Sequence, residues 1–545
     1  MTKNNNVILI PARGGTSNVA RQNLRLVADK PLIYYVIKNA LSYTNNVYVS
    51  TDSDEIRDVS LLYGAKVIQR PKNLTSDSTK LEEIAFDVLA KINRNHTFEK
   101  CLILNPKYPL IKPSTIKKLF SILNGKIQTV YGFDQISHYQ YKQILFYSNG
   151  FGKFTNELSN CVITEKIVAF NCKKFLRTRK FSTEKFGLKL TENEPIALNS
   201  YHDFGVLEKI LKRRRILVRV DGSSKIGLGH VHNTLTILNH FRNDEILIVM
   251  NSQNKLGYKK FQEHLYQVNF FKNDSQLFEV IKKFQPHMIF NDILDTSINY
   301  IKKLKKEKIF VVNFEDLGDG RRYADLVFNP IYHSNKNNSN EYFGPNFACV
   351  RDEFRIWEPT VLKTSPKNVV IIFGGSDPTN KTYQVLKLLE KYKLKNMKYS
   401  IIIGQDYKER KKLLDLISKM KKDNFLIELN ENIDFLSKIF HESDFAITSN
   451  GRTVFELGSL HVPMIVIPVN EREKRHTFVQ KSNVGYMIQL HNVSETHDFL
   501  KVFNKMLQYN IRKKFQNNLK RINLLDGVDQ VINKIMYEYE KNKNN

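Results

Sequence analysis

The feature that most constrains this chain is a pattern in which a short apolar run ends in a glycine-rich or polar turn and a helical run follows. The pattern occurs three times beyond residue 215. The apolar runs are 216–220, 369–373 and 444–448, and the turns are 227–230, 374–378 and 449–453. Strands that alternate with helices form parallel sheets, and ligands bind beyond the carboxyl ends of such strands. The sequence therefore predicts α/β lobes whose turns gather around a ligand.

The residue types in these turns point to a phosphate ligand. Backbone N–H groups at the start of a helix can face an anion, and glycine lets the backbone approach it closely. His230 follows Gly227 and Gly229, where it can act on whatever the phosphate carries. Glu456 lies in the helix after the third turn, at a place suited to accept the two hydroxyls of a ribose. A Gly-Leu-Gly turn alone is a weak signal, so the nucleotide-sugar hypothesis depends on the three turns together.

Three further side chains near these turns are candidates for a role in the site. Asp377 is expected to cap the helix that follows the second turn, with Ser376 as the more direct phosphate neighbour. His232 lies in the helix after the first turn and is expected to pack or cap. His476 follows the loop at 470–471 and is an open candidate for an acid or base.

On these residues, the region from about 215 to 500 resembles the UDP-sugar hydrolases of nonulosonic (sialic-like) acid biosynthesis, which are pseudaminic-pathway relatives of the MurG-type glycosyltransferases. The segments that carry the resemblance are 219–223, 226–230, 344–345, 351–354, 374–378, 450–453 and Glu456. It implies a two-lobed GT-B architecture in which the second lobe holds most of the nucleotide. It also implies that His230 activates a water that attacks the sugar C1 while UDP departs. The nucleotide-sugar contacts expected are Gly227, Gly229, Gly374, Gly375, Ser376, Asn450, Gly451, Thr453, Glu456 and Asn470.

The chemistry is consistent with these residue types, although the sequence departs from the family near the sugar. A neutral imidazole can serve as a base near pH 7, helix N-termini can stabilise the departing phosphate, and no metal is required. The arginine usually found three residues after the histidine is Asn233, and the Asp-His-Tyr segment of the first lobe is replaced at 291–294. An acidic pair survives at 315–316, and an Asn-Gln pair becomes Asn-Glu at 470–471. These changes concern the sugar more than the nucleotide.

A second pattern of the same kind occupies residues 5–205. It resembles the CMP-sialic acid synthetases, nucleotidyltransferases with a Rossmann-like sheet, well over 5–115 and poorly over 116–205. The segments that carry the resemblance are 7–15, 21–23, 30–33, 47–53, 69–71 and 77–79. It implies that the Ala-Arg-Gly-Gly loop holds the phosphates of CTP and that Asn23 and Arg70 read the cytosine. The CTP contacts expected are Arg13, Gly14, Gly15, Asn23, Arg70 and Ser78.

The departures in this N-terminal region concern catalytic groups. Ser17 and Gln22 stand where the family has lysines, and Ala197 and Asn199 align with two Mg²⁺-binding aspartates, while Asp203 is retained. A triphosphate carries several negative charges that cations and metal-bound carboxylates normally neutralise. Mg²⁺ is the one cofactor that the resemblance implies here. Two interpretations stay open, a working cytidylyltransferase and a degenerate binding or scaffolding domain.

Together the resemblances imply an enzyme of nonulosonic (sialic, pseudaminic or legionaminic-like) acid biosynthesis. A UDP-2,4-diacetamido-2,4,6-trideoxy-sugar hydrolase-like activity, which needs no cofactor, would be fused to a CMP-nonulosonate cytidylyltransferase-like domain. The expected ligands are UDP-sugars and CTP or a CMP-sugar. The first alternative is a GT-B glycosyltransferase that uses a UDP-sugar donor, with an acceptor hydroxyl in place of water. The second is a non-catalytic nucleotide-sugar-binding scaffold.

Boundary signals predict an α/β chain with a Rossmann-like nucleotidyltransferase domain followed by a two-lobed GT-B domain. The basic run at 212–215 ends a helical run and precedes a strand, and Pro359 and Pro366 punctuate a second junction. The domains expected are 1–212, 213–360 and 361–535, the last similar to family 28 glycosyltransferase C-terminal domains. A chain of 545 residues is long enough for three such units.

Composition indicates the setting. Hydrophobic residues make up 41% of the chain, which is typical of a globular protein, and no run approaches the roughly 18 apolar residues of a membrane span. Residues 1–6 lack a signal-peptide pattern, so we expect a cytoplasmic protein without a transmembrane segment. The four cysteines have no CxxC spacing, which favours free thiols over a metal site. The sequence is compatible with a homo-oligomer but does not specify one.

The net charge of +29 raises the question of nucleic-acid binding. Lysines are scattered along nearly all the helical runs, and the densest runs, 209–215, 302–308 and 408–422, do not interleave aromatic residues as a base-stacking surface does. We therefore expect no specific nucleic-acid binding. The scattered lysines indicate compositional drift more than a focused patch, and attraction of anionic nucleotide sugars or membrane surfaces is favoured over nucleic-acid binding.

Overall fold

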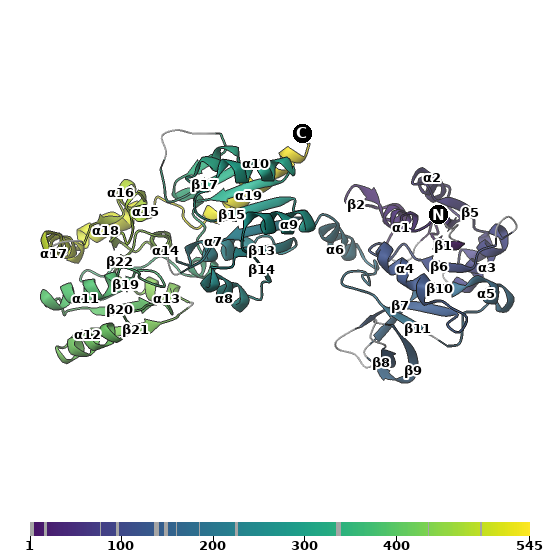
Figure 1. Ribbon diagram of the computed structural model, residues 1–545, viewed down its shortest axis with the longest axis horizontal. Helices are drawn as coiled ribbons and strands as arrows, with labels where there is room; N and C mark the ends of the chain where they lie inside the picture. Colours follow the sequence, from purple (N-terminus) through teal and green to yellow (C-terminus); the bar gives the residue numbers. More distant parts are fainter. Residues whose placement is uncertain are drawn as a thin grey trace. The chain divides into compact units, whose positions relative to one another are not determined.

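The computed structural model describes residues 5–15, 19–76, 78–93, 97–135, 141–146, 151–159, 161–184, 186–223, 227–333, 339–433, 435–490 and 493–544. Ser17 and Ile226, which the sequence analysis singled out, lie outside the described residues. The chain divides into two compact units, 1–212 and 213–545. Each unit is built on sheets with strands and helices in alternation (Figure 1).

The first unit contains a nine-stranded mixed sheet. Its strand order is β5-β4-β1-β6-β10-β7-β11-β9-β8. The strands are β1 (Asn6–Pro11), β4 (Val47–Thr51), β5 (Lys66–Gln69), β6 (Lys100–Leu104), β7 (Thr129–Gln135), β8 (Tyr141–Phe146), β9 (Phe151–Ser159), β10 (Cys161–Asn171) and β11 (Phe186–Lys189). β1 pairs in parallel with β4 and β6, whereas β10 runs antiparallel to β6. The Arg-Gly-Gly loop directly follows β1, so it lies at the carboxyl edge of the parallel part of the sheet.

Helices cover both faces of this sheet because apolar residues alternate along its central strands. The helices are α1 (Leu32–Leu41), α2 (Asp54–Leu62), α3 (Leu81–Ile92), α4 (Pro113–Ile122), α5 (Cys172–Thr178) and α6 (Tyr201–Leu211). Ile8 and Ile10 of β1 pack in a core with α1 and α4, whereas Val7 and Leu9 pack in a second core with α3 and α5. A strand that buries both sets of side chains is typical of a sheet between two helical layers.

The first lobe of the second unit is a seven-stranded sheet in which every pair is parallel. Its order is β14-β13-β12-β15-β16-β17-β18. The strands are β12 (Arg215–Val220), β13 (Glu245–Asn251), β14 (Val268–Phe271), β15 (Met288–Asp292), β16 (Phe310–Phe314), β17 (Leu326–Asn329) and β18 (Glu341–Phe343). The helices are α7 (Gly229–Leu238), α8 (Lys255–Glu263), α9 (Asp274–Phe284) and α10 (Ile298–Lys306). The predicted strand, glycine turn and helix are β12, the turn at 227–228 and α7.

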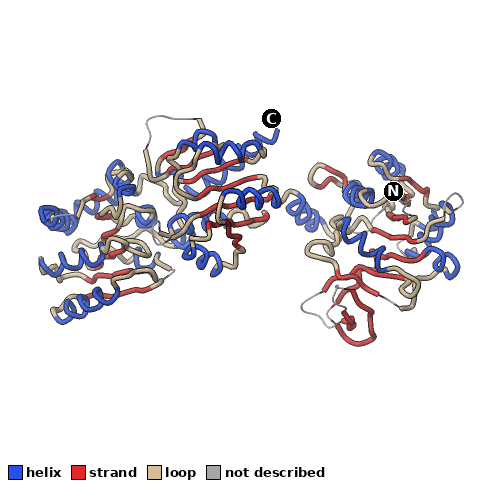
Figure 2. Tube along the Cα trace, viewed as in Figure 1, coloured by secondary structure: helices blue, strands red, loops and turns tan. Residues whose placement is uncertain are grey.

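The second lobe is a six-stranded parallel sheet with the order β21-β20-β19-β22-β23-β24, flanked by helices on both sides (Figure 2). The strands are β19 (Asn368–Ile372), β20 (Lys398–Ile403), β21 (Leu426–Glu431), β22 (Phe445–Thr448), β23 (Met464–Val466) and β24 (Gly485–Met487). The helices are α11 (Lys381–Lys391), α12 (Arg410–Lys422), α13 (Ser437–His441), α14 (Thr453–Ser459), α15 (Glu471–Lys474), α16 (Phe478–Lys481), α17 (Val493–Leu507) and α18 (Tyr509–Leu519). β19 leads to α11 and β22 leads to α14, so the predicted fold class is confirmed.

The last helix returns to the first lobe. α19 (Gly527–Asn544) appears in yellow among the teal elements of that lobe in Figure 1. Val531 and Ile535 of α19 lie in the core that contains Ile216 and Val231. The sequence analysis grouped residues up to 535 with the second lobe, whereas the structure packs this segment on the first. The cause is tertiary, since the apolar side of α19 matches a core built from residues much earlier in the chain.

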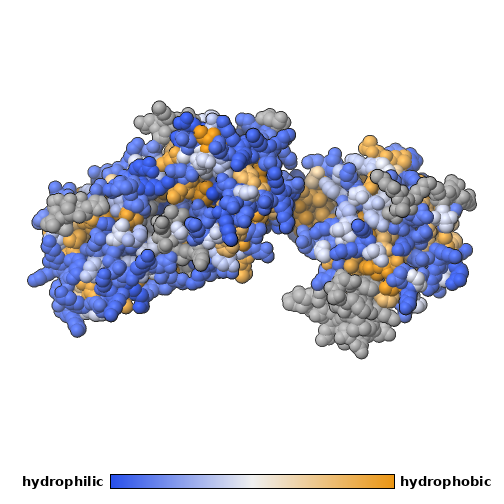
Figure 3. Space-filling view, in the orientation of Figure 1, coloured by the Kyte–Doolittle hydropathy of each residue, from blue (hydrophilic) through white to orange (hydrophobic). Residues whose placement is uncertain are grey.

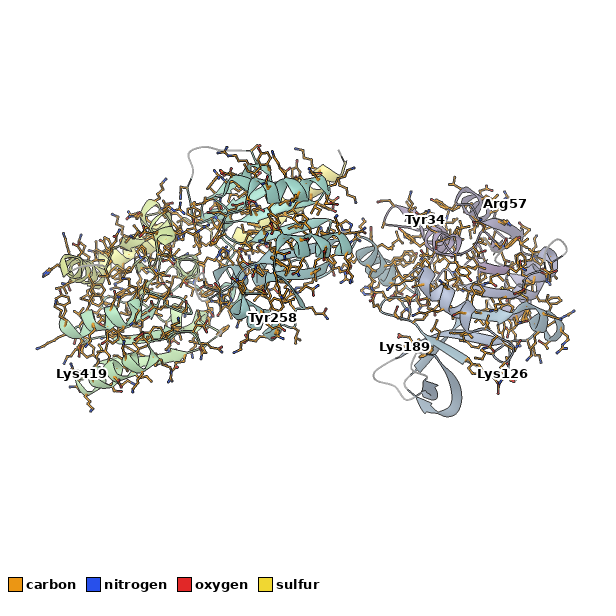
Figure 4. The ribbon with its side chains drawn as sticks, viewed as in Figure 1. Tyr34, Arg57, Lys126, Lys189, Tyr258 and Lys419 are labelled. Carbon is orange, nitrogen blue, oxygen red and sulfur yellow. The ribbon has the colours of Figure 1, made fainter. Side chains whose placement is uncertain are left out.

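The surface is polar and its cations are dispersed. On the face that Figure 3 shows, hydrophilic residues predominate and the apolar patches are small and separate. The labelled cations Arg57, Lys126, Lys189 and Lys419 belong to different helices, strands and loops (Figure 4). Among the described residues, no helix combines the length and apolarity that a membrane crossing requires.

Candidate functional site

A cavity of about 670 Å³ lies in the second unit, between the carboxyl edges of its two parallel sheets. Turns from both lobes line it, as the shared direction of parallel strands requires. The structure brings all but one of the predicted nucleotide-sugar contacts together there. The lining residues among them are Gly227, Gly229, Gly374, Gly375, Ser376, Gly451, Thr453, Glu456 and Asn470, and His230, the predicted catalytic residue, lines the cavity as well.

His230 is held by a buried carboxylate. Its Nδ1 lies 2.7 Å from Asp292 Oδ1, and only 6% of His230 and 1% of Asp292 are exposed. Asn233 Nδ2 and Thr234 Oγ1 donate to the other oxygen of Asp292 at 2.6 and 3.2 Å. A carboxylate at Nδ1 favours the tautomer in which that nitrogen carries the proton and Nε2 is free to accept one. His230 lines the cavity, and its Nδ1 is held by Asp292.

An arginine from the second lobe reaches this cluster. Arg452 Nη1 donates to Asn233 Oδ1 at 2.6 Å, and Arg452 Nη2 lies 3.0 Å from Glu315 Oε1. Arg472, also from the second lobe, donates to the backbone oxygen of Glu315 at 2.5 Å. The two lobes thus meet through Glu315 and Asn233.

Glycine is required at two points of the cavity wall. Gly227 and Gly374 have φ values of +77° and +76°, in the left-handed region that other residues rarely adopt. Apart from the adjacent residues, the part of the chain that the structure describes has no atom within 4 Å of the position that a Cβ would take on either residue. Backbone conformation, rather than crowding, is therefore the reason for these glycines, and the space above both turns is open to a ligand.

Carboxylates of the chain itself occupy helix N-termini in the second lobe. Asp377 accepts the N–H groups of Lys381 at 2.8 Å and Thr382 at 2.7 Å, so it caps α11 as predicted. Glu473 accepts the N–H groups of Asn450 at 3.1 Å and Val469 at 3.0 Å. These amides are therefore already paired.

Asn450 is the predicted contact that does not line the cavity. Its side chain is fully buried and donates to the backbone oxygens of Glu473 at 2.9 Å and His476 at 3.0 Å. His476 Nδ1 in turn contacts the backbone oxygen of Asn450. Burial lowers the pKa of His476, which keeps its ring neutral. The geometry gives Asn450 a positioning role, because its amide is used to fix the loop that bears Arg452 and Thr453.

Glu456 lies at the cavity wall, where it forms an ion pair that the sequence did not reveal. Arg351 Nε donates to Glu456 Oε1 at 2.7 Å, and Arg351 Nη1 lies 2.7 Å from Glu353 Oε1. Glu353 also accepts the N–H group of Ser437 at 3.0 Å. The Glu456 carboxylate is thus fixed in place beside the cavity.

Sequence reasoning did not assign a role to Asp292, Arg452, Glu315 or Glu473. A usable signal existed for Asp292, since it ends an apolar strand adjacent to β12 and Val220 pairs with it in register. A polar residue at the carboxyl end of a buried parallel strand is typical of a site residue. The contacts of Arg452 join positions that are far apart in the chain, and no local pattern predicts such a pairing.

In the first unit, the predicted CTP contacts gather around the loop after β1. Arg13 Nη1 donates to Thr75 O at 3.2 Å, Asn23 Nδ2 donates to Arg13 O at 3.1 Å, and the Gly14 N–H group donates to Asp52 Oδ1 at 2.9 Å. Gly15 is exposed, and beyond its neighbours in the chain no described residue has an atom within 4 Å of the position that a Cβ would take on it. Ser78 is also exposed, and its Oγ lies 2.9 Å from Ser76 Oγ.

Arg70 is the most buried cation of this group. It is 4% exposed and donates to Ser50 Oγ at 3.1 Å and Ser50 O at 2.6 Å. Burial lowers the pKa of Arg70 to about 10, and the nearby charge of Arg13 acts in the same direction. Two arginines that lie close enough to repel each other favour an anion between them.

Residues at or next to the altered catalytic positions of the first unit bond to other parts of the chain. Gln22 is 1% exposed and donates to Leu198 O at 2.6 Å. Asp203 accepts the N–H groups of Asn199 and Ser200, both at 2.8 Å, and forms a capping box with Ser200 at the start of α6. Among the described residues, no group of three His, Cys, Asp or Glu side chains is arranged to hold a metal ion.

Comparison with known proteins accounts for both halves. The Cytidylyltransferase family model matches residues 7–157, and the model of the Glycosyltransferase family 28 C-terminal domain matches residues 369–524. The chain is a fusion of these two kinds of domain. The fusion protein retains the cytidylyltransferase fold in its first unit and the family 28 domain in the second lobe of its second unit.

Individual relatives cover parts of the fusion protein. An uncharacterized protein of Methanocaldococcus jannaschii is 28% identical over 301 residues, which cover 52% of this chain and 60% of that protein. CMP-N,N'-diacetyllegionaminic acid synthase of Legionella pneumophila is 38% identical over 118 residues, 21% of this chain and 51% of that enzyme. The chain thus spans between half and two thirds of the length of these curated relatives. MurG of Acinetobacter baumannii is 13% identical with a TM-score of 0.44, over 59% of this chain and 99% of that one.

The cavity yields a prediction about stability and pH. Burial raises the pKa of Glu473 to about 7, whereas a glutamate in an unfolded chain titrates near 4.3. Between these values the folded state binds more protons than the unfolded state, so the contribution of Glu473 to the free energy of unfolding falls as pH rises. Through this group the wild-type protein should lose on the order of 3 kcal/mol of its free energy of unfolding between pH 4.5 and 7, and Glu473→Gln should remove that loss. Denaturant unfolding across this range measures it.

The matched control is Glu471→Gln, which changes an exposed glutamate of the same helix. This variant should follow the wild-type pH dependence. A wild-type protein and a Glu473→Gln protein with parallel profiles would show that the Glu473 carboxyl titrates normally.

Proposed function

We propose that the second unit cleaves a UDP-sugar at the anomeric carbon and transfers the sugar to water. The observation that carries the proposal is the buried pair of His230 and Asp292 beside two open glycine turns. A base with an orienting carboxylate serves a reaction in which a proton must leave the nucleophile. The substrate class that the fusion favours is a UDP-linked 2,4-diacetamido-2,4,6-trideoxy sugar, because the first domain belongs with enzymes of nonulosonic acid activation.

The reaction is a substitution at C1. His230 Nε2 accepts a proton from water as the water oxygen forms a bond to C1. The bond from C1 to the bridging oxygen breaks, and its electron pair stays on the β-phosphate of UDP. Asp292 holds the imidazole at Nδ1 and stabilises the imidazolium that forms. Backbone N–H groups at the start of α7 face the growing phosphate charge.

The proposal places the nucleotide against the second lobe. Gly374, Gly375 and Ser376 would lie along the diphosphate, and Glu456, fixed by Arg351, would accept the ribose hydroxyls. Thr453, Gly451 and Asn470 line the same wall. These assignments rest on lining and geometry, and no metal takes part in any of the steps.

Glycosyl transfer to an acceptor hydroxyl is the second candidate. The family 28 match favours it, because that family is named for glycosyl transfer. The same base would then take its proton from the acceptor. The degree to which His230 is enclosed argues for the smaller nucleophile, since water reaches a residue that is 6% exposed more readily than a glycan does.

A variant pair tests the base. His230→Asn should lower the rate of UDP release from UDP-sugars on the order of 10²-fold or more, because a positioned general base contributes about that much. UDP affinity by calorimetry should change little. Asp292→Asn should lower the turnover number with a smaller effect on KM, because it acts directly on the tautomer of His230 and only through Asn233 on Arg452.

The control is His232→Asn, which changes a histidine of the same helix that also lies at the cavity wall. This protein should retain most of its activity. Turnover by the His230→Asn protein at the wild-type rate would contradict the assignment of the base.

For the first unit we propose nucleotide binding with slow transfer. Arg13, Asn23 and Arg70 supply two cations and an amide around one loop, which is sufficient to bind CTP or CMP. The donor set does not fit Mg²⁺, because Ala197 and Asn199 lack carboxylates and Asp203 caps α6. Attack on an α-phosphate needs that charge neutralised.

The full-length protein should therefore bind CTP or CMP weakly and form CMP-nonulosonates slowly, if at all, with Mg²⁺ present. Chromatography of reactions that contain CTP, Mg²⁺ and a nonulosonic acid measures the product. CMP-sugar formation at a rate comparable with UDP release would overturn this part of the proposal. It would indicate a bifunctional enzyme.

A further inference from the structure

Many of the groups at the cavity that could hold a diphosphate are already paired within the chain. Lys259 donates to Gln405 Oε1 at 2.8 Å, and Lys260 lies 3.0 Å from Glu263 Oε2. The N–H groups at the start of α11 are taken by Asp377, and that of Asn450 is taken by Glu473. Glu315 and Glu456 add negative charge to the cavity wall. A UDP-sugar that binds there needs a cation to offset these carboxylates.

Three arginines of the second unit contribute to the cavity wall, and two of them have other functions. Arg351 is held between Glu353 and Glu456. Arg472 donates to Asp295 Oδ1 at 3.2 Å and to Glu315 O at 2.5 Å. Arg452 differs, because its Nε is buried and donates to no acceptor among the described residues. A buried charged donor without an acceptor is costly, so such a group calls for an explanation.

The position of Arg452 supplies that explanation. Arg452 lies across the glycine turn that precedes His230, and a methyl group on Gly229 would be 3.4 Å from Arg452 Cδ. Its Nη1 donates to Asn233, which also holds Asp292. The guanidinium therefore sits between the turn at the start of α7 and the proposed base. In the proposed reaction the β-phosphate occupies this region.

We propose that Arg452 binds the β-phosphate of the nucleoside diphosphate through the edge of its guanidinium that carries Nε and Nη2, and that Glu315, which lies at Nη2, is the internal carboxylate that competes with the phosphate for this edge. The inference rests on the proposed function, because it requires a nucleoside diphosphate in the cavity. Arg452 keeps its contact with Asn233 while phosphate oxygens take the place of Glu315 Oε1. As the bond at C1 breaks, the β-phosphate gains charge, and the same contact strengthens.

The burial and backbone conformation of Glu315 suit a competing role. It is 6% exposed and its φ is +54°, a left-handed conformation that is uncommon for a residue other than glycine. The next residue, Asp316, fixes this conformation by accepting from Thr296 N at 3.0 Å, Gly318 N at 2.8 Å and Asn313 Nδ2 at 2.7 Å. Backbone strain of this kind persists where the surrounding contacts hold it, and such positions cluster at functional sites.

The test compares UDP with UMP, which lacks the β-phosphate. Calorimetry on full-length Arg452→Ala should show a loss of UDP affinity of about 10- to 100-fold, the range for hydrogen bonds to a charged group. UMP affinity should change by less than about threefold. Equal losses for UDP and UMP, or no loss for either, would overturn the proposal, because Arg452 would then only join the lobes or play no part in binding.

Glu315→Gln separates the phosphate role from a lobe-joining role and also decides the matter if Arg452→Ala does not fold. Removal of the competing charge should raise UDP affinity severalfold and leave UMP affinity unchanged. A lobe-joining pair predicts that Glu315→Gln weakens both ligands, and that result, or unchanged UDP affinity, would overturn the proposal. If the wild-type protein binds neither UDP nor UMP, the proposed function itself fails. If the wild-type protein binds UDP and UMP, and both variants keep the same ratio of UDP affinity to UMP affinity, only the role of Arg452 is refuted.

Discussion

The carboxylate of Asp292 is the interaction on which the site of the second unit depends. It lies at the end of a central strand of a fully parallel sheet and bonds to His230, Asn233 and Thr234 of α7. A carboxylate that is 1% exposed is stable only when its oxygens are well paired, so the helix α7 is held in a fixed position relative to the strand that bears Asp292. That relation orients the imidazole and places the glycine turn over the cavity. Through Asn233 it also reaches Arg452, which links the first lobe to the nucleotide lobe.

Much of the fold follows from local sequence. Apolar runs that end in glycine turns predict parallel strands whose carboxyl ends meet, and Gly227, Gly374 and Gly451 indeed line one cavity. The capping role of Asp377 was also predictable, because a turn aspartate before a helix has few other partners for its oxygens.

The side-chain pairings were not predictable. His230 and Asp292 lie 62 positions apart, and Arg452 meets Asn233 across 219 positions. Such contacts are set by how sheets and lobes pack, which periodicity does not encode. The return of α19 to the first lobe is a second case, since the helix pattern fixes an apolar face but not the core it enters. Asn450 shows a different case, because the amide of a residue predicted at the ligand by resemblance bonds to the backbone of Glu473 and His476.

The two halves of the fusion protein differ in the charged and polar groups that lie at their predicted sites. In the first unit, Gln22 and Asp203, at or near the positions that the resemblance implies are catalytic, make structural contacts with Leu198 and Asn199. In the second unit, His230 is paired with the Asp292 carboxylate, and glycine turns line the cavity beside it. Binding a nucleotide needs a shaped pocket, whereas transfer needs developing charge to be neutralised. The proposed function of the second unit requires both.

The most direct test of the central claim is cleavage of a UDP-2,4-diacetamido-2,4,6-trideoxy sugar in ¹⁸O-labelled water, with mass spectrometry of both products within minutes. Attack by water on C1, assisted by His230, predicts free sugar without any added acceptor and UDP that contains no ¹⁸O. Label in the β-phosphate of UDP, which would mean attack at phosphorus, would contradict the account. A complete requirement for an acceptor would contradict it as well.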